Sequence, residues 1–398
     1  MRGTAKWRAL EQAHRFQTSS MRILALITDG FGVSGGIGKF NRDLLEAVCA
    51  HPGVTSLTAL PRLMAPGTDV PTDGVFAKLT YLTAGVNSKA KYLTTLGRDL
   101  LRGPAYDMIL CGHINLSPLG WLCRLRTGGS LVQIVHGSEA WHPTGDTLTD
   151  WAVRSADAFI TVSHVTRERF SNWTELPPSV GFVLPNSIDP TRFTPGPKKQ
   201  TLLDRYGLRD KTVLLTLGRL EAEEQAKGFD EVLDALESLA SEIPDLAYLI
   251  VGDGTDRSRL EAKAQSLGLS ERVTFAGFIP EEEKVDHYRL ADVYAMPSRL
   301  EGFGIVYLEA MACGIPVIGS NIDGSLEAIP DESFGITVDP DKPEELKKAI
   351  RASLRKPRGV PERLDRFSYE NFSRRVHEII DTLEDVKRSA PLQAEGPA

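Results

Sequence analysis

The stretch VYAMPSRLEGFGIVYLEAMACGIPVIGS, residues 293–320, contains a complete strand–loop–helix–strand unit. The apolar runs at 293–298 and 316–320 have the length and composition of buried strands. Between them, Gly302 and Gly304 favour a loop, and the run YLEAMA favours a helix. Two strands joined in this way normally lie parallel in one sheet, so the stretch predicts an open α/β sheet.

The same alternation continues on both sides of this stretch. Apolar runs typical of strands begin near residues 21, 107, 130, 158 and 181, and again near 212, 247, 272 and 335. Amphipathic segments separate them; in the first, Ile37, Phe40, Leu44 and Val48 recur at helical spacing. The pattern predicts doubly wound parallel sheets, in which ligands collect at the carboxyl ends of the strands.

A chain of 398 residues is too long for one ordinary core, and the pattern is interrupted at DPTRFTPGPKK, residues 189–199. We therefore predict two Rossmann-like domains of like construction, at residues 21–195 and 196–370. An amphipathic helix is expected at 371–388. Residues 1–20 are interpreted as an N-terminal extension, with an appended basic helix as the alternative, and residues 389–398 as a disordered tail.

The composition, with 41% hydrophobic and 25% charged residues, is that of an ordinary globular protein. No apolar run approaches the roughly 20 residues needed to cross a bilayer, and residues 1–20 lack a secretory signal, which favours a cytoplasmic protein. The four cysteines are scattered, which argues against a zinc site or a disulfide framework. Residues 1–195 carry 19 Lys+Arg against 15 Asp+Glu, whereas the remainder carries 27 against 38. Nucleic acid is therefore not an expected partner, although the first half could attract an anionic acceptor or membrane.

The loop and helix of residues 298–320 are the strongest candidate site. Glu301 and Glu309 are separated by seven residues, and Gly302 and Gly304 let ligand atoms approach the backbone. The N–H groups at the start of the following helix suit a diphosphate. The two carboxylates can then reach different parts of one elongated ligand, such as a nucleotide sugar. The alternative is two solvated carboxylates near a helix N-terminus.

The segment EGFGIVYLEAMACGIPVI resembles the signature of family 4 glycosyltransferases, and the resemblance extends over nearly the whole chain from Met21. It implies the GT-B fold, in which two Rossmann-like domains face a central cleft, and we expect the helix at 371–388 to pack back on the first domain. It also implies that Glu301 contacts the donor sugar and Glu309 the ribose. The diphosphate would be held by the backbone of Phe303, Gly304, Ile305 and Val306.

Arg219 and Lys227 form a second constellation in LGRLEAEEQAKGF, where the arginine follows a strand and the lysine precedes a helix. Both cations are expected at the carboxyl edge of the sheet, where they would neutralise the leaving diphosphate. The alternative is two surface cations in an acidic loop. Similar enzymes carry an Arg and a Lys-Gly here, often with a shorter spacing.

Gly30, Gly32 and Gly35 form a literal G-x-G-x-x-G between a strand and a helix, which would suggest a dinucleotide site. The acidic residue expected about twenty residues later is missing, because the segment SLTALPRL offers no carboxylate. The family resemblance favours a different role, in which Gly35 and Gly36 face the donor diphosphate across the cleft.

Three further residues are candidates for contacts with the donor. His136 ends a buried strand in QIVHG, where a side chain points into the cleft, and by resemblance it contacts the sugar near the reacting carbon. Asn186 in LPNSIDP resembles a family turn before the linker, with Ser187 replacing the common glycine. Base recognition is expected near Phe278 to Pro280, on Ile279.

The sequence thus predicts a glycosyltransferase that moves a hexosyl group from a nucleotide-diphosphate sugar to a glycan or lipid-linked acceptor, in cell-surface polysaccharide or glycolipid synthesis. The resemblance implies retention of anomeric configuration, and no metal or other cofactor is expected. Residues 88–103 (SKAKYLTTLGRDLLRG) are interpreted as a core-packing helix with a basic outer face, and contact with an anionic membrane, peripheral on its inner face, is the alternative. A nicotinamide-dependent oxidoreductase and a non-catalytic sugar-binding protein remain alternative functions, and the donor base, sugar and acceptor remain open.

Overall fold

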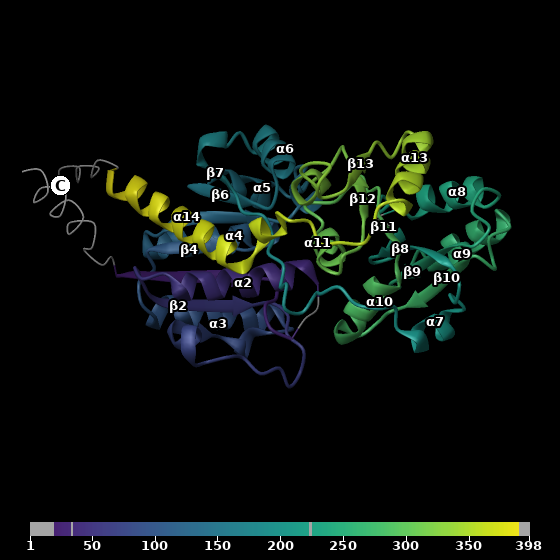
Figure 1. The fold of residues 1–398 in the computed structure, drawn as a ribbon. Helices are drawn as coiled ribbons and strands as arrows, with labels where there is room; N and C mark the ends of the chain where they lie inside the picture. Colours follow the sequence, from purple (N-terminus) through teal and green to yellow (C-terminus); the bar gives the residue numbers. More distant parts are fainter. Residues whose placement is uncertain (1–19, 33–34, 223–224, 390–398) are drawn as a thin grey trace, which may run out of the picture.

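The computed structural model describes residues 20–32, 35–222 and 225–389. Within these residues the chain forms two parallel sheets, of seven and six strands, each flanked by helices (Figure 1). One sheet belongs to the first half of the chain and the other to the second. The predicted α/β fold of two doubly wound domains is therefore confirmed.

The first sheet has the order β3-β2-β1-β4-β5-β6-β7, and all its strand pairs are parallel. Successive residues of each central strand enter different cores: Met108 and Leu110 face one side, and Ile109 and Cys111 the other. Burial on both faces explains why these strands read as continuous apolar runs. The strands are β1 (Met21–Ile27), β2 (Val54–Pro61), β3 (Leu79–Tyr81), β4 (Met108–Cys111), β5 (Ser130–Val135), β6 (Ala158–Thr161) and β7 (Gly181–Val183), and the α-helices are α2 (Gly36–Ala50), α3 (Lys89–Arg102), α4 (Ser117–Thr127), α5 (Thr147–Arg154) and α6 (His164–Thr174).

The second sheet has the order β10-β9-β8-β11-β12-β13, again parallel throughout. Its chain order doubles back beside β8, which places the loops after β8 and β11 next to each other at the carboxyl edge. The strands are β8 (Thr212–Leu217), β9 (Leu246–Val251), β10 (Val273–Gly277), β11 (Val293–Ala295), β12 (Val317–Ser320) and β13 (Ile336–Val338), and the α-helices are α7 (Gln200–Tyr206), α8 (Phe229–Leu239), α9 (Arg257–Ser266), α10 (Lys284–Leu290), α11 (Ile305–Ala312), α12 (Ser325–Ala328) and α13 (Pro343–Leu354).

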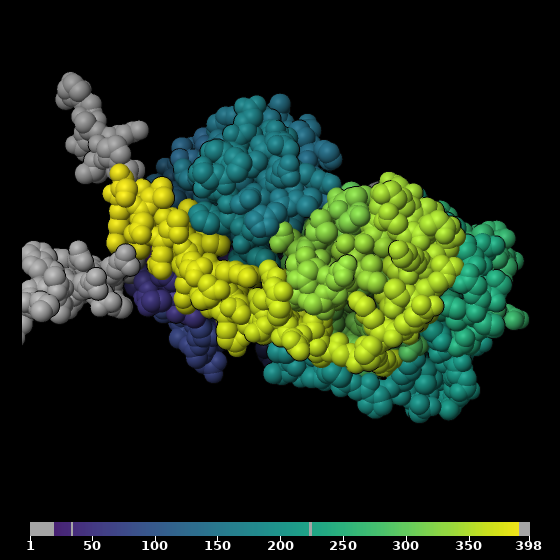
Figure 2. All heavy atoms as spheres, turned by 45° about the horizontal axis from the view of Figure 1, so that its top comes forward, coloured from purple at the N-terminus to yellow at the C-terminus, as the bar shows by residue number. Residues whose placement is uncertain are grey.

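The last helix, α14 (Tyr369–Ser389), returns from the second domain and packs along α2 of the first. Figure 2 shows this yellow segment running across the surface from one domain to the other. Phe372 and Val376 of α14 share a core with Phe40 and Leu44 of α2, and the rings of Phe40 and Phe372 meet edge to face. The chain therefore crosses between the domains twice, before α7 and before α14.

None of the helices in the described part of the chain combines the length and apolar character needed to span a bilayer.

Candidate active site

Lys227 and Glu301 come from separate loops and form one ion pair. Lys227 precedes α8, Glu301 follows β11, and the lysine Nζ lies 3.0 Å from the carboxylate Oε2. The side chains are only 19% and 18% exposed, so the attraction between them is screened less than at an open surface. The structure thus brings together two residues that the sequence proposed for one site from independent segments.

Helices α8 and α11 both begin at a glycine in the left-handed backbone region, Gly228 (φ 83°) and Gly304 (φ 88°). A Cβ at Gly228 would lie 2.7 Å from the ring of Pro297, and one at Gly304 would lie 2.3 Å from the ring of Tyr307. Neither glycine offers a side-chain cap. The first N–H groups of each helix, which have no acceptor within the helix, therefore remain available for an anion between Lys227 and the start of α11.

Glu309 lies inside α11 and is held by α10. Its Oε1 accepts from Lys284 Nζ at 2.8 Å, and its Oε2 accepts from the Tyr288 hydroxyl at 2.7 Å. Only 3% of Glu309 is exposed, whereas 18% of the Glu301 side chain is exposed. Burial, and then the negative charge of Glu309, raise the pKa of Tyr288, so the phenol stays protonated as a donor. Sequence reasoning missed Lys284 and Tyr288, although their spacing of four residues places them on one helix face.

Asp323 holds the backbone of Glu301 in place through hydrogen bonds. Its carboxylate accepts from the backbone N–H of Glu301 at 2.9 Å and of Ser325 at 3.0 Å, and the N–H of Gly324 donates to the carbonyl of Glu301 at 2.8 Å. Asp323 is fully buried, and this burial raises its pKa to about 6 despite the hydrogen bonds that lower it. The residue therefore positions the Glu301 loop. Its only sequence signal is an Asp-Gly turn after β12.

His136 follows β5 of the first domain and lies against the Glu301 loop of the second domain, since a Cβ at Gly302 would lie 2.0 Å from the His136 carbonyl oxygen. Its Nε2 lies 3.1 Å from the carbonyl oxygen of Gly112, and its backbone N–H donates to Glu139 Oε1 at 2.5 Å. Burial lowers the pKa of His136, so the ring is neutral at pH 7. Because a carbonyl can only accept, Nε2 carries the proton and Nδ1 keeps its lone pair. The edge of the Phe40 ring, with centroids 5.0 Å apart, fixes the imidazole plane.

His113 is a second neutral imidazole at the same edge of the first sheet, and sequence reasoning missed it. It follows β4, the strand next to β5, and its Nδ1 accepts from the N–H of Asn115 at 3.1 Å. Burial is the main cause that lowers its pKa, and the negative charge of Glu139 opposes this effect in part. The proton of His113 therefore sits on Nε2. A signal was present, because His113 follows the strand-like run DMILCG just as His136 follows SLVQIV.

The glycines of the first loop have different neighbours. A Cβ at Gly30 would lie 2.8 Å from the hydroxyl of Tyr81, and one at Gly32 would lie 1.9 Å from Oγ1 of Thr68. Side chains of the first domain thus pack closely against these two glycines. Gly35, by contrast, has no atom within 4 Å of such a Cβ among the described residues.

The second loop glycine, Gly36, faces the other domain, because a Cβ there would lie 3.6 Å from Ile305 at the start of α11. The remaining candidates lie on three other segments. Arg219 is exposed after β8, and Ile279 follows β10 and packs partly against the core. Asn186 is buried beside Ser187, whose hydroxyl donates to Asp43 at 2.6 Å and lies 2.8 Å from Lys39.

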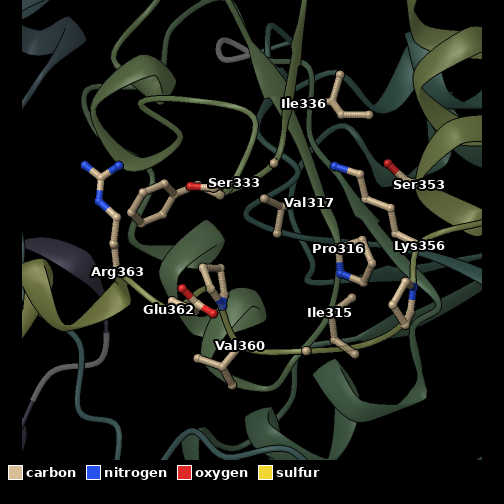
Figure 3. Close-up of a pocket in the computed structure, with 15 residues that line it drawn as sticks. Ile315, Pro316, Val317, Ser333, Ile336, Ser353, Lys356, Val360, Glu362 and Arg363 are labelled. Atoms are coloured by element: carbon tan, nitrogen blue, oxygen red, sulfur yellow. The ribbon is translucent and has the colours of Figure 1, made fainter.

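A cavity of about 340 Å³ lies elsewhere in the second domain (Figure 3). Its wall includes Val317, Ile336 and Lys356, at the amino ends of β12 and β13 and just after α13. This is the sheet edge opposite to Glu301, since all six strands are parallel. The cavity is therefore separate from the candidate site.

The family model described as "Glycosyl transferases group 1" matches residues 199–374, and the model for "Glycosyltransferase Family 4" matches residues 35–192. The GDP-mannose-dependent alpha-(1-6)-phosphatidylinositol monomannoside mannosyltransferase of Mycolicibacterium smegmatis is 34% identical over 294 residues, covering 69% of this chain and 76% of that protein. The D-inositol 3-phosphate glycosyltransferase of Thermobispora bispora is 29% identical over 396 residues, covering 89% and 86%.

Solved structures share the fold. Anabaena HepE in complex with UDP-glucose superposes with a TM-score of 0.70 at 20% identity, covering 92% of this chain and all of that one. Sucrose-phosphate synthase from Thermosynechococcus elongatus gives a TM-score of 0.69 at 23% identity, with the same coverage.

Proposed function

The chain belongs to the family 4 glycosyltransferases, and we propose that it transfers a hexosyl group, with retention, from a nucleoside-diphosphate sugar bound between Lys227, Glu301 and the start of α11. The observation that carries this proposal is the ion pair between Lys227 and Glu301 beside the uncapped α11. A cation and free amides suit the diphosphate, and a carboxylate suits sugar hydroxyls. The comparisons give no support for a nicotinamide-dependent oxidoreductase.

The chemical demand of this reaction is mainly electrostatic. As the bond between the sugar carbon and the diphosphate oxygen breaks, negative charge grows on the diphosphate. Lys227 and the amides of Ile305 and Val306 stabilise this charge, because they are already oriented before the reaction, and in the proposal Arg219 adds a further positive charge. Glu301 accepts from the sugar hydroxyls and fixes the reacting carbon in place, and Asp323 fixes Glu301 in turn.

The first domain supplies the other side of the sugar. The free Nδ1 of His136 accepts a hydrogen bond from a hydroxyl of the donor sugar near the reacting carbon, since its Nε2 is engaged by Gly112. The Nε2–H of His113 is a donor suited to the acceptor oxygen. For retention, the new bond forms on the face from which the diphosphate leaves, and the proton of the acceptor hydroxyl passes to the departing phosphate oxygen. Nuclear magnetic resonance of the product anomer tests this stereochemistry.

We propose GDP-mannose as the first donor to examine and a lipid-linked or glycan acceptor, because the mycobacterial relative is named for that nucleotide sugar and for a phosphatidylinositol mannoside. In this proposal the enzyme works on the cytoplasmic side, in cell-surface polysaccharide or glycolipid synthesis. Glu309 would contact the ribose, Ile279 the base, and Gly35, Gly36 and Asn186 the far side of the diphosphate and sugar.

Donor hydrolysis with GDP-, UDP- and ADP-sugars tests the proposal. We expect the sugar nucleotides with one of the three bases to be hydrolysed at least about tenfold faster than the others, because a wrong base leaves buried polar groups of the protein unpaired. Nicotinamide dinucleotides should not compete. Tight NADH binding without binding of any nucleoside diphosphate would overturn the proposal. Nucleoside-diphosphate binding without hydrolysis or transfer of any donor would instead favour a non-catalytic sugar-binding protein, and unchanged turnover in Lys227→Ala would contradict the role proposed for that residue.

A further inference from the structure

The outer faces of α3, α4 and α5 carry large apolar side chains in contact with solvent. Leu101 of α3 is 77% exposed and Leu125 of α4 is 62% exposed. The inner faces of the same helices are well packed, since Tyr92, Leu96 and Cys123 are buried against the first sheet. The exposed set, which we name the α3–α5 surface, comprises Leu93, Leu101, Leu122, Leu125, Leu148 and Trp151.

These residues belong to one continuous side of the first domain. The inner faces of α3 and α4 pack on Ile109 and Cys111 of β4, and α5 packs on the same face of the sheet through Val153. The rings of Trp121 on α4 and Trp151 on α5 meet with centroids 4.7 Å apart. Helices α2 and α14 cover the opposite face of the sheet. The α3–α5 surface is therefore a single patch on the side away from α14.

The charge of these helices is strongly positive. Together α3, α4 and α5 contain seven Lys and Arg against two Asp, in a chain whose net charge is −7. One of the two acids, Asp99, accepts from the hydroxyl of Tyr106 at 2.7 Å and is turned inward. Among the described residues, only one of the seven basic side chains, Arg124, forms an ion pair, and its partner is Asp157. The basic residues are Lys89, Lys91, Arg98, Arg102, Arg124, Arg126 and Arg154.

We propose that the α3–α5 surface rests on an anionic lipid bilayer. Leucine and tryptophan side chains gain by entering the boundary between headgroups and acyl chains, and Lys and Arg gain by approaching anionic headgroups. A nucleic acid would use the charges but not the leucines. A bilayer surface uses both the apolar and the basic side chains, and a second copy of the chain is the alternative occupant that the test below distinguishes.

This placement also orients the cleft. The three helices lie flat on the sheet, so the strands run parallel to the membrane when the α3–α5 surface is in contact with it. His113 and His136, at the carboxyl ends of β4 and β5, then lie at the side of the domain, one layer of helices away from the bilayer surface. A lipid-linked acceptor could enter the cleft without leaving the bilayer. Binding itself does not depend on the donor-site proposal and is measured without any sugar.

The test is co-sedimentation of the full chain with vesicles of phosphatidylcholine containing phosphatidylglycerol, or of phosphatidylcholine alone, at low and high salt. We expect binding only to the anionic vesicles and its loss at high salt. Each basic residue near the surface strengthens partitioning about fivefold, so Arg98→Gln with Arg102→Gln should lower it about 25-fold. Leu93→Ser with Leu101→Ser should also lower it. A matched charge control, Lys348→Gln with Arg355→Gln in the second domain, should leave binding unchanged.

Donor hydrolysis and thermal unfolding verify that each variant is folded; we expect both to be unchanged, because the altered side chains are exposed. Equal binding by the α3 variants and the wild type would overturn the proposal, as would the absence of binding to anionic vesicles at low salt. If the control pair lowered vesicle binding as much as the α3 pair does, the effect would depend only on the net charge of the protein, and the assignment to α3 would be overturned. A dimer in sedimentation velocity that Leu93→Ser with Leu101→Ser dissociates, without vesicle binding, would instead assign the patch to a second copy of the chain.

Discussion

Replacing Lys227 with alanine should abolish most turnover and destabilise the fold only modestly. The change leaves the Glu301 carboxylate, 18% exposed, without the ammonium group 3.0 Å away. Loss of one hydrogen bond between charged groups costs about 2 kcal/mol in unfolding free energy. Loss of a cation oriented toward the leaving diphosphate should lower kcat by about 10² to 10³, because this charge acts mainly in the transition state. Steady-state donor hydrolysis and urea unfolding measure the two effects separately.

A second substitution separates a catalytic role from a structural one. Lys227→Ala combined with Glu301→Gln removes the unpaired carboxylate, so most of the lost stability should return. Turnover should stay as low as in Lys227→Ala or fall further, since both groups act on the donor. Recovery of turnover together with stability in the double variant would refute the argument, because the pair would then serve only to hold two loops together.

Three further predictions concern residues that support the site. The folded state binds the proton of Asp323 more tightly than the unfolded chain does. As the pH falls from 7 to 5, the unfolding free energy of the wild type should therefore rise by about 1 kcal/mol relative to that of Asp323→Asn; a difference between their urea midpoints that stays the same at both pH values would contradict this. His113→Gln should leave donor hydrolysis unchanged and raise the acceptor KM about tenfold, the value of one hydrogen bond; slower donor hydrolysis would place His113 with the donor instead. Tyr288→Phe should weaken nucleoside-diphosphate binding about fivefold in calorimetry, because Glu309 loses a fixed donor; lower stability with unchanged affinity would make Glu309 structural.

The fold was largely predictable because the central strands are buried on both faces. Runs such as SLVQIV and TVLLTL are apolar along their whole length, and the structure places β5 and β8 there. The strand β3 (Leu79–Tyr81) was missed. It has three residues, lies at the sheet edge and is at most half-buried, so it produces no apolar run. Short edge strands are specified by the neighbour they pair with, here β2.

The candidate site was predictable only where its residues are close in sequence. Glu301, Gly304 and Glu309 share one segment, and Lys227 is indicated as a candidate by the glycine that follows it. The residues that hold them in place are distant: Asp323 lies 22 positions from Glu301, and Lys284 lies 25 from Glu309. Such contacts depend on how α10 and the loop after β12 pack around α11. No local pattern encodes that packing, which is why the candidate residues could be named from the sequence and the residues that hold them in place could not.

Gly302 shows the same limit within the motif itself. From sequence, this glycine lets a ligand approach the backbone. In the structure a Cβ at Gly302 would lie 2.0 Å from the carbonyl oxygen of His136 and 2.7 Å from the Cα of Gly137, both in the other domain. The glycine is therefore required by the approach of the two walls of the cleft, independently of any ligand. Gly137 (φ 157°) has the complementary need, since its own Cβ would lie 2.8 Å from the Cα of Gly302. Because the contact joins the loops that carry His136 and Glu301, any side chain at either glycine would separate the two groups that are proposed to hold the donor sugar from opposite sides.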